Sequence, residues 1–441
     1  MKNRIIEKYN RKDSLLIIAG WPKKRETYSQ GVCAVSSFTK NALTALQKEN
    51  PDRKIVVLTM QIDKKEIYEE DGMLILRCFK RNKSLSYLSL IKHIFLFNRI
   101  KDLLIEFEFS SFGNTFMTGL LAPIIWALFL MRKNINLVIH QVVSDIKDLS
   151  GHIGIPVNNS RMSIFNNFLK LFYFSLALPS KRVIVLEEEF KTKLSRLVGS
   201  DKITVIPHGV DTNIKKTNKD MRKSLGIKND EFVILYFGYL TWYKGVDFLV
   251  NTLKNTNKIS GKKIRLVVAG GPSFTQEEKV HYQRFLKKVE KAVESSKNVI
   301  LTGFVKEKDI TPIFKAADLS VFPYRTFMSS SGPLSLAISH NKPFILSKNL
   351  EALTHSSDIQ RSMNGAGIKK NDIIFKLNKK DLIKTIKTCM DFKMQKKMII
   401  FSKMINEERS FANLAKVYDK TISGKASEEK VSIVYNLTSL S

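Results

Sequence analysis

The chain has 441 residues, of which 44% are hydrophobic, and carries 73 Lys and Arg against 41 Asp and Glu, a formal charge of +32. The length predicts two or three domains with sizeable cores, and the composition excludes disorder throughout. The three cysteines, Cys33, Cys78 and Cys389, exclude a disulfide scaffold and a cysteine-rich metal site, and they fit a reducing compartment. A chain this basic favours anionic partners: nucleic acid, an acidic membrane face or phosphorylated small molecules.

The N-terminal half alternates short apolar runs with helical periodicity. Its first run, Leu15–Ala19, is too short for the core of a signal peptide, and we expect it to be a buried strand. A helix is expected over Phe38–Asn50. Continuous apolar runs between helices are typical of parallel strands buried on both faces. Further strands of this kind are expected at Ile55–Thr59, Leu74–Leu76, Leu103–Phe107, Leu137–His140 and Arg182–Leu186.

Two apolar stretches raise the question of a membrane. Phe109–Met131 has no charged residue and is long enough to cross a bilayer, whereas Gly119, Pro123 and its polar beginning favour a helix in the core or at an interface. The second stretch, Ile164–Leu178, is interrupted by Lys170. Together with the positive charge, these helices suit a surface that rests on an anionic leaflet, and they equally suit core helices under a solvated basic surface.

The second half begins with a cluster of Pro, Gly and Asp at Thr204–Asp211, which predicts a boundary near residue 208. We therefore expect an α/β fold of two doubly wound, Rossmann-like domains, 1–207 and 208–400, that face each other across a cleft, with a polar tail at 424–441. The second domain is expected to contain strands at Phe232–Phe237, Ile264–Ala269, Val299–Thr302, Leu319–Phe322 and Pro343–Leu346, and helices at Gly245–Asn255, Glu277–Glu294, Ile310–Ala316 and Leu334–Ser339.

Several loops whose residues suit ligand binding follow strands of the second domain. In open parallel sheets, ligands bind beyond the carboxyl ends of the strands. Gly238 permits a turn, and Lys244 stands where a helix begins, a combination that suits a diphosphate, although a single surface lysine is common without any role. Gly270 and Gly271 let the backbone approach a ligand closely, or they simply end a strand.

Other candidate residues are serines and histidines. Ser329–Gly332 precede a helix expected to begin near Pro333, where they suit either a phosphate or an N-cap. His140 ends a strand, where a histidine can contact a substrate or belong to the core. His140, His152 and His208 form no convincing metal set, and the P-loop, G-x-G-x-x-G, Asp-x-Asp and nucleophile-elbow patterns are absent.

Taken together and in order, these segments resemble glycosyltransferase family 4, which has the GT-B fold. The resemblance covers nearly the whole chain, is strong from Val183 to Ile345 and is weak between residues 60 and 135. The segments that carry it are QGV (Gln30–Val32), His140, VIVLEEEFKTKL (Val183–Leu194), VIPHGVD (Val205–Asp211), FGYLTWYKGVDFLV (Phe237–Val250), VVAGGP (Val267–Pro272), LTGFVKEKDITPIFKAADLSVFPY (Leu301–Tyr324), SSGPLSLAISHNKPFI (Ser330–Ile345) and FSKMINEERSFANLAKVYDKTI (Phe401–Ile422).

The resemblance implies a retaining, hexosyltransferase-type enzyme that uses a nucleotide diphospho-sugar and needs no metal or other cofactor. It places the donor against the C-terminal domain and the acceptor against the N-terminal domain, and it implies a closing helix over 401–423 that returns to the N-terminal domain. His140 and Lys244 match the family's catalytic positions, as the sugar-contacting histidine and the diphosphate lysine. The remaining matches are Gly31, Ser330, Ser331 and Gly332 at the donor phosphates, and Gly238, Gly270, Phe304 and Val305 around the base and ribose.

Two departures from the family pattern matter. The arginine that usually precedes the lysine is Tyr239, and the usual pair of glutamates falls on Met328 and Leu336. Neither replacement can hold a sugar hydroxyl or a ribose through a carboxylate. The sequence resembles a subgroup with PYR…SG in this place, so the resemblance carries over the transfer reaction but not the identity of the sugar.

The leading interpretation is a glycosyltransferase that builds a surface polysaccharide on a glycan or lipid-linked acceptor, in the cytoplasm or peripherally on the inner face of the cell membrane. A non-catalytic relative that binds a nucleotide sugar or a partner is the first alternative, motivated by Met328 and Leu336. Nucleic-acid binding is motivated by charge alone, and the scattered lysines show no recognition module, so no nucleic acid is expected as a partner. A sugar-nucleotide epimerase would need catalytic carboxylates or histidines that the sequence does not assign.

Overall fold

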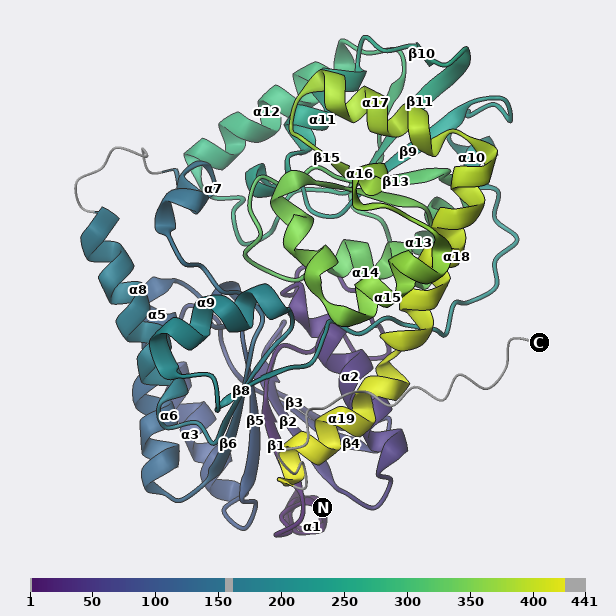
Figure 1. Ribbon diagram of the computed structural model, residues 1–441. Coiled ribbons are helices and arrows are strands. Elements are labelled where there is room, and N and C mark those ends of the chain that lie inside the picture. Colours follow the sequence, from purple (N-terminus) through teal and green to yellow (C-terminus); the bar gives the residue numbers. More distant parts are fainter. Residues whose placement is uncertain (1, 155–161, 425–441) are drawn as a thin grey trace.

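The computed structural model describes residues 2–154 and 162–424 and contains two α/β lobes, one above the other (Figure 1). Each lobe is a mixed, mostly parallel sheet between helices, and the carboxyl ends of the parallel strands in both sheets point towards the space between the lobes. The expected pair of Rossmann-like domains facing across a cleft is confirmed. The polar tail expected at 424–441 lies outside the described residues, apart from Gly424.

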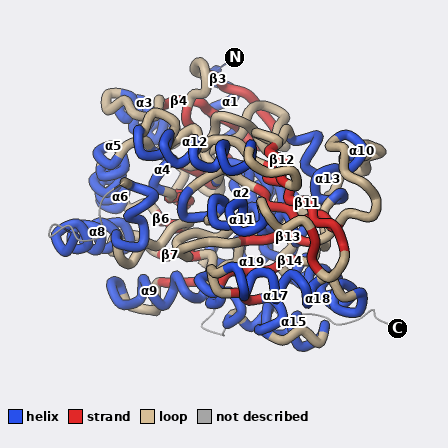
Figure 2. The backbone as a smooth tube through the Cα atoms, turned by 90° about the horizontal axis from the view of Figure 1, so that it is seen from above, coloured by secondary structure: helices blue, strands red, loops and turns tan. Residues whose placement is uncertain are grey.

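The N-terminal sheet has strand order β3-β4-β2-β1-β5-β6-β7-β8 in the described residues, and only β3 is antiparallel to its neighbour. The central strands β1 and β2 are fully buried, and β5 is buried except at Asp102, because helices cover both faces. Figure 2 shows these helices on both sides of the strands. The strands are β1 (Leu15–Ile18), β2 (Ile55–Met60), β3 (Glu66–Glu70), β4 (Met73–Phe79), β5 (Asp102–Phe107), β6 (Asn134–Ile139), β7 (Arg182–Val185) and β8 (Ile203–Val205).

The helices of this lobe include two that matter for the site: the first turns of α2 line the cavity, and α8 borders it. The complete set in the described residues is α1 (Lys2–Tyr9), α2 (Val35–Glu49), α3 (Ser86–Leu96), α4 (Phe109–Phe112), α5 (Thr115–Gly119), α6 (Leu121–Leu130), η1 (Ile146–Leu149), α7 (Ser150–Ile153), α8 (Met162–Ala177) and α9 (Glu188–Val198).

The strand β3 is a feature that the apolar-run analysis missed. It pairs antiparallel with β4 through a two-residue turn at Asp71 and Gly72, which both have positive φ, as a type I′ hairpin requires. β3 lies at the edge of the sheet and is half exposed, so its sequence EIYEE is charged rather than apolar.

The apolar stretch Phe109–Met131 does not form one helix. It is divided into α4, α5 and α6, and the first break falls at Gly113, whose φ is 129°. In the described residues, none of the helices is long and apolar enough to cross a membrane. The sequence favoured a buried or interfacial helix over a bilayer span at this place, and the structure has three short helices there.

The C-terminal sheet has the order β10-β11-β9-β13-β14-β15, with β12 paired to β11, in the described residues. Its parallel strands are continuous apolar runs, as expected from the sequence. The strands are β9 (Phe232–Phe237), β10 (Lys258–Ile259), β11 (Lys262–Ala269), β12 (Val299–Leu301), β13 (Leu319–Phe322), β14 (Phe344–Ser347) and β15 (Ile374–Phe375). The helices are α10 (Met221–Ser224), η2 (Trp242–Lys244), α11 (Val246–Leu253), α12 (Val280–Glu294), α13 (Glu307–Ala316), α14 (Gly332–Ser339), η3 (Lys348–His355), α15 (Ser357–Ala366), α16 (Lys370–Ile373) and α17 (Lys379–Cys389).

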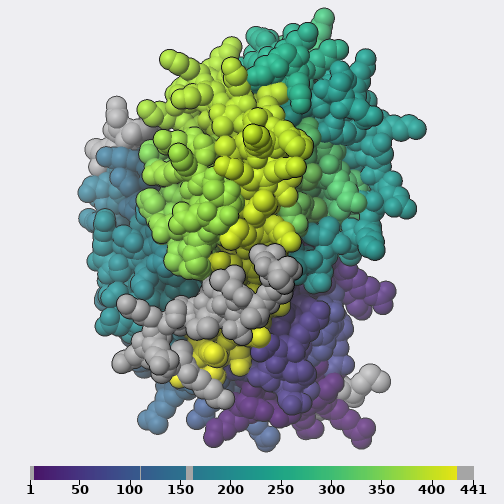
Figure 3. Space-filling view, turned by 45° about the vertical axis from the view of Figure 1, so that its right-hand side comes forward, coloured from purple at the N-terminus to yellow at the C-terminus, as the bar shows by residue number. Residues whose placement is uncertain are grey.

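The chain returns to the N-terminal lobe through two helices, α18 (Phe392–Glu408) and α19 (Phe411–Ser423). Helix α18 packs on α14 and α15, and α19 packs on α2. The yellow segment in Figure 3 spans both lobes in this way. The returning helix is thus present, but it starts at Phe411, because the backbone breaks at Arg409 and pairs there with Val210 (Val210 N to Arg409 O, 2.8 Å).

Candidate functional site

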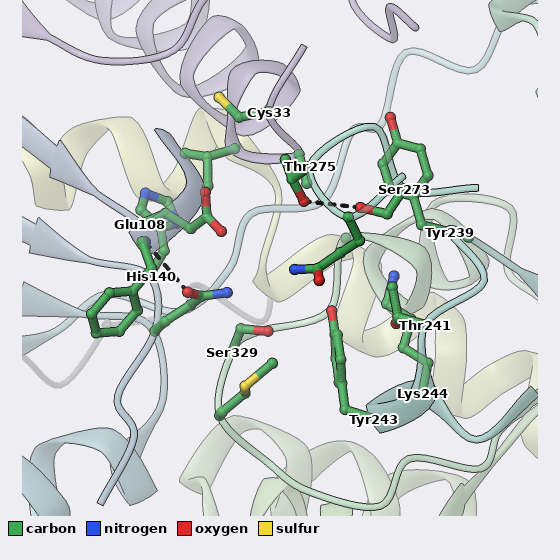
Figure 4. Close-up of a pocket in the computed structure, with 18 of the residues that line it drawn as sticks. Cys33, Glu108, His140, Tyr239, Thr241, Tyr243, Lys244, Ser273, Thr275 and Ser329 are labelled. Carbon is green, nitrogen blue, oxygen red and sulfur yellow. Dashed lines mark hydrogen bonds between the residues drawn. The ribbon is translucent and has the colours of Figure 1, made fainter. Parts of the chain in front are cut away.

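One large cavity, of about 1170 Å³, lies between the two lobes. Loops at the carboxyl ends of strands from both sheets line it, as the doubly wound topology predicts. Figure 4 shows Glu108 and His140 on one side of it and Tyr239, Thr241 and Lys244 on the other. The sequence-predicted residues that line the cavity are His140, Gly238, Lys244, Gly270, Phe304, Val305, Ser330, Ser331 and Gly332.

Gly31 is the one predicted residue that the structure does not bring to the cavity wall. It lies in an exposed turn with a φ of 79°, and its neighbours Val32 and Cys33 line the cavity instead. The helix after this turn begins only at Val35, so Gly31 precedes the helix by a turn rather than opening it. Val32 and Cys33, rather than Gly31, therefore form the part of the cavity wall that the glycine loop was expected to form.

Lys244 is the strongest chemical feature of the C-terminal wall. It ends η2, is only 7% exposed, and lines the cavity. Among the described residues its Nζ has no hydrogen-bond or ion-pair partner, and burial alone lowers the pKa of this amine to about 8. A buried cation without a counter-charge is costly, so this position favours a bound anion.

The lysine is positioned by glycines. Gly245, with a φ of 71°, follows it directly, and a Cβ there would lie 2.0 Å from Pro323 O. Across the wall, a Cβ on Gly238 would lie 3.1 Å from Lys244 Nζ. Only glycine fits either place without displacing the backbone or the amine.

Two strand ends meet beside the lysine. A Cβ on Gly270 would lie 1.9 Å from Gly238 O, and Gly238 N donates a 3.0 Å hydrogen bond to Ala269 O. Next along the chain, a Cβ on Gly271 would lie 3.0 Å from Phe304 N. The wall is therefore made of backbone at this point, which leaves peptide groups rather than side chains to face a ligand.

The same wall also has an aromatic part, formed by Tyr239 and Phe304. Tyr239 and Phe304 have ring centroids 6.3 Å apart and ring planes tilted by 34°. Burial, followed by the nearby Cys33 and Glu277, raises the pKa of Tyr239 to about 12, so its hydroxyl is neutral at physiological pH. With Val305 they form an apolar surface that suits the flat face of a base.

The serines before α14 already form hydrogen bonds within the protein. Ser331 is the N-cap: its Oγ accepts from Leu334 N at 3.2 Å and lies 2.7 Å from Tyr324 Oη. Ser330 Oγ donates a 2.9 Å hydrogen bond to Glu187 of the other lobe. Of the open alternatives for this loop, the N-cap is present. A ligand here would meet the N-terminus of α14 and Gly332, where no atom lies within 4 Å of a built Cβ.

The N-terminal wall centres on His140. Its Nε2 lies 3.4 Å from Glu106 Oε2, and Thr39 Oγ1 donates a 2.5 Å hydrogen bond to the same oxygen. Phe38 packs edge-on against the imidazole at 4.8 Å between ring centroids. Glu106 is 2% exposed and lies behind the histidine, so it does not contact a ligand in the cavity. The contact between Glu106 and His140 is not a hydrogen bond, and Nε2 of His140 has no hydrogen-bond partner in the described residues.

Sequence reasoning missed Glu106, and it also missed Glu108. Both acids lie at the end of the otherwise apolar run LLIEFEF, the carboxyl end of β5, and charges in a buried strand were the available signal. Glu108 is 8% exposed and, with Glu278, supplies the carboxylates of the described cavity wall. Met328 and Leu336 also line the cavity and are buried, so the places where the resemblance would put an acidic pair are apolar here.

A buried charge network joins the two lobes beside the cavity. Arg409, at the break between α18 and α19, donates from Nε to Asp358 Oδ2 at 2.6 Å and lies 3.8 Å from Glu187. Burial opposes ionisation of Asp358, but Arg409 overcomes it and holds the pKa of that carboxyl at about 2. Burial raises the pKa of Glu187 to about 7 despite Arg409 and the hydrogen bond from Ser330.

Two further points concern charged side chains. The arginine of the PYR motif, Arg325, does not face the cavity; it pairs bidentately with Asp247 at 2.7 and 2.8 Å.

Within the described residues, no group of three or more His, Cys, Asp or Glu side chains is arranged to hold a metal ion. The expectation that transfer needs no metal stays a prediction.

Part of the chain is similar to known glycosyltransferases. Residues 217–350 match the model for "Glycosyl transferases group 1". An uncharacterised glycosyltransferase of Methanocaldococcus jannaschii is 28% identical over 153 residues, covering 33% of this chain and 36% of the relative. The lipopolysaccharide 1,2-N-acetylglucosaminetransferase of Salmonella typhimurium is 26% identical over 172 residues, covering 38% of this chain and 39% of the relative. These matches span well under half the length of either relative.

Solved structures show the fold of the whole chain. Sucrose-phosphate synthase of Thermosynechococcus elongatus superposes with a TM-score of 0.68 at 12% identity, covering 93% of this chain and all of that one. HepE of Anabaena, solved in complex with UDP and glucose, superposes with a TM-score of 0.61 at 15% identity, covering 93% of this chain and 99% of that one. The chain therefore has the GT-B fold, and its residues 217–350 match the group 1 glycosyltransferase model.

Proposed function

We propose that this protein transfers a hexose from a nucleotide diphospho-sugar to a hydroxyl of a glycan or lipid-linked acceptor, with retention of anomeric configuration, as a member of glycosyltransferase family 4. The observation that carries the proposal is Lys244, a buried amine without a counter-charge in the wall of the interlobe cavity. A diphosphate would supply that counter-charge. The group 1 domain and the fold support the same reaction class.

The donor lies along the C-terminal wall in this proposal. Its diphosphate contacts Lys244 and the N-terminus of α14 at Gly332, because the ammonium and the helix end both favour an anion. Its base lies on the surface of Tyr239, Phe304 and Val305, and the backbone at Gly238 and Gly270 borders the ribose. The HepE complex with UDP and glucose is a precedent for such a ligand within the fold.

The reaction breaks the bond between the anomeric carbon and the β-phosphate oxygen and forms a bond from that carbon to the acceptor oxygen on the same face. The nucleoside diphosphate leaves and takes up the acceptor's proton. Charge grows on the leaving phosphate in the transition state, so Lys244 stabilises it more than the ground state. His140, beside Glu106, contacts the transferred sugar from the opposite wall.

The acceptor binds on the N-terminal side, and the product belongs to a cell-surface polysaccharide or glycolipid. Two partial relatives support this class: the Salmonella lipopolysaccharide enzyme, and the alpha-monoglucosyldiacylglycerol synthase of Streptococcus pneumoniae, which is 26% identical over 181 residues. The protein then works in the cytoplasm, at the inner face of the membrane, where nucleotide sugars and lipid-linked acceptors meet.

A second candidate function is a non-catalytic protein that binds a nucleotide sugar or a partner transferase. The observation that favours it is the apolar lining at Met328 and Leu336, where family members carry acids. It predicts tight donor binding without turnover for any acceptor supplied.

A thermal-shift panel of UDP, GDP, ADP and CMP and their sugar forms, without added metal, tests the donor site. Ligand at a hundred times its dissociation constant stabilises the protein by about 2.7 kcal/mol. We expect a selective shift with one diphosphate, its loss in Lys244→Ala, and a fall in transfer of about 10²–10³-fold. Lys262→Ala, at the far end of β11, is the matched control and should leave both unchanged. No shift across the panel, or a full shift in Lys244→Ala, refutes the donor site.

A further inference from the structure

The N-terminal lobe has a large exposed apolar surface. Most of the exposed large apolar side chains in the described residues lie on α3, α6 and α8 and the turns next to them. We name this surface the α3–α8 face, and its helices lie along the same side of the lobe in Figures 1 and 2. Its exposed members are Leu85, Leu88, Phe95, Leu96, Phe116, Trp126, Phe129, Leu130, Met131, Ile164, Phe165, Phe168, Leu171, Phe174 and Leu178.

The exposure of these side chains is high. Leu85 is 80% exposed, Leu130 76%, Phe116 67% and Phe168 65%. Isolated apolar side chains are common on protein surfaces, but a group of this size on one side of one lobe marks a surface that is covered when the protein works.

The charges around the face select its partner. Residues 83–101, 109–133 and 162–181 contain no Asp or Glu. A second copy of this chain would bring like charges against the face, whereas an anionic bilayer would neutralise them. The cations in these three segments are Lys83, Lys92, Arg99, Lys101, Arg132, Lys133, Lys170 and Lys181.

The face lies on a bilayer rather than crossing it. Helix α6 has 10 residues, which is about 15 Å, half of the hydrocarbon thickness of about 30 Å. Trp126, on α6, is 37% exposed, and indoles prefer the level of the lipid headgroups. Short, apolar helices with a basic border are typical of proteins that bind the membrane from one side.

The face continues into the interlobe cavity. Phe165 and Phe168 of α8 are exposed on the face and also line the cavity. Thr115 and Gly119 of α5 line the cavity as well, so α5 and α8 both border its mouth. The apolar face and the proposed acceptor side therefore share a wall.

We propose that the α3–α8 face docks on an anionic phospholipid bilayer and holds the mouth of the cavity, at Phe165 and Phe168, against the lipid. A lipid-linked acceptor then enters from the bilayer, with its polar head in the cavity and its apolar tail in the membrane. The docking stands on the face alone; the entry of an acceptor rests on the function proposed above.

Vesicle co-sedimentation of the full chain tests the docking. We expect binding to vesicles with about one quarter phosphatidylglycerol and much weaker binding to pure phosphatidylcholine, at about 0.15 M salt. A triple variant with one change on each helix, Leu88→Glu, Leu130→Glu and Leu171→Glu, should lower the partition coefficient at least about a hundredfold. None of the three side chains lines the cavity.

The matched control is a second triple variant with the same chemistry on the other lobe. Phe392→Glu, Ile399→Glu and Ile400→Glu replace exposed apolar side chains of α18 and should leave vesicle binding unchanged. The nucleotide-induced thermal shift, measured without vesicles, should be equal in wild type and both variants. It shows that the variants are folded, and it tests the donor site separately from the docking.

A fluorescent label tests whether the mouth of the cavity lies against the lipid. The three native cysteines are buried, so Phe168→Cys and Phe392→Cys can each be labelled selectively with an environment-sensitive dye. Anionic vesicles should shift the emission of the label at position 168 to the blue and leave that at 392 unchanged. Equal binding to neutral vesicles, undiminished binding of the first triple variant, or no shift at position 168 overturns the proposal, whatever the nucleotide panel shows.

Discussion

The two walls of the cavity differ in how their charged groups are satisfied. On the C-terminal wall, the buried Lys244 lies over the ring of Tyr243 and has no hydrogen-bond or ion-pair partner in the described residues. On the N-terminal wall, His140 Nε2 lies 3.4 Å from Glu106 Oε2 without a hydrogen bond, and Thr39 donates to that oxygen. The first wall therefore leaves a buried cation without a counter-charge, whereas the second already has a carboxylate beside its histidine and opens onto an apolar face.

This difference indicates which ligand each wall selects. A wall of backbone and one unpaired cation recognises a phosphate group that many nucleotide sugars share. The N-terminal wall, where a carboxylate already lies beside the histidine, offers less net charge to an incoming molecule. Donor binding should therefore be the tighter and more salt-dependent of the two steps.

The largest expected effect is on the free energy of unfolding, and it tests whether the buried charge network at Arg409 joins the two walls. Arg409→Ala leaves Asp358 and Glu187 buried without their cation at the junction of the lobes, so we expect it to lower the free energy of unfolding by about 3–5 kcal/mol in urea titrations. Arg361→Ala, which removes an exposed pair with Glu408, should cost at most about 1 kcal/mol. Equal costs would show that the buried network does not join the walls.

The next effect tests the backbone fit of the C-terminal wall. Gly270→Ala places a methyl group 1.9 Å from Gly238 O, so the strand ends must separate, at a cost of about 3 kcal/mol, and nucleotide binding should fall with it. Gly365→Ala on α15, whose Cβ meets only the flexible end of Met404 and which does not line the cavity, is the control for an ordinary glycine. A nucleotide affinity that survives Gly270→Ala would mean that the donor does not use this wall.

A smaller effect tests the pairing on the N-terminal wall. Glu106→Gln keeps the shape of the side chain and removes its charge, which should cost about 1.5–3 kcal/mol of transition-state stabilisation, or about tenfold to a hundredfold in kcat. The dissociation constant of the nucleotide should not change, because Glu106 lies behind His140 and away from the donor. A change in nucleotide affinity instead of kcat would contradict this assignment.

The smallest effect is a pH dependence of nucleotide binding. Since burial holds the pKa of free Lys244 at about 8, the charged form that binds a diphosphate is lost as the pH rises through that value. Affinity should fall about eightfold between pH 7.5 and 9, with proton uptake on binding that calorimetry in two buffers can measure. Lys244→Met should bind weakly at every pH, without this slope; a slope that persists there would place the titrating group elsewhere.

The alternation of apolar runs made the fold predictable, because strands buried on both faces are continuous apolar runs that can be recognised in the sequence. The edge strand β3 was missed since its exposed side needs charge, although the Asp71–Gly72 turn marked it. Lys244 could be placed because a helix start and a lysine are neighbours in sequence. The Glu187–Arg409 contact could not, because it joins residues that are far apart along the chain and meet only when the lobes pack.

The return of α19 to the N-terminal lobe has a consequence for biosynthesis. Phe411, Leu414, Tyr418 and Ile422 of α19 belong to the same buried cluster as Phe38 of α2. The first lobe to leave the ribosome therefore lacks part of its core until the last described helix has been made. A nascent chain carries an open apolar groove on α2 throughout the synthesis of the C-terminal lobe, and it is then that chaperones would have most to cover.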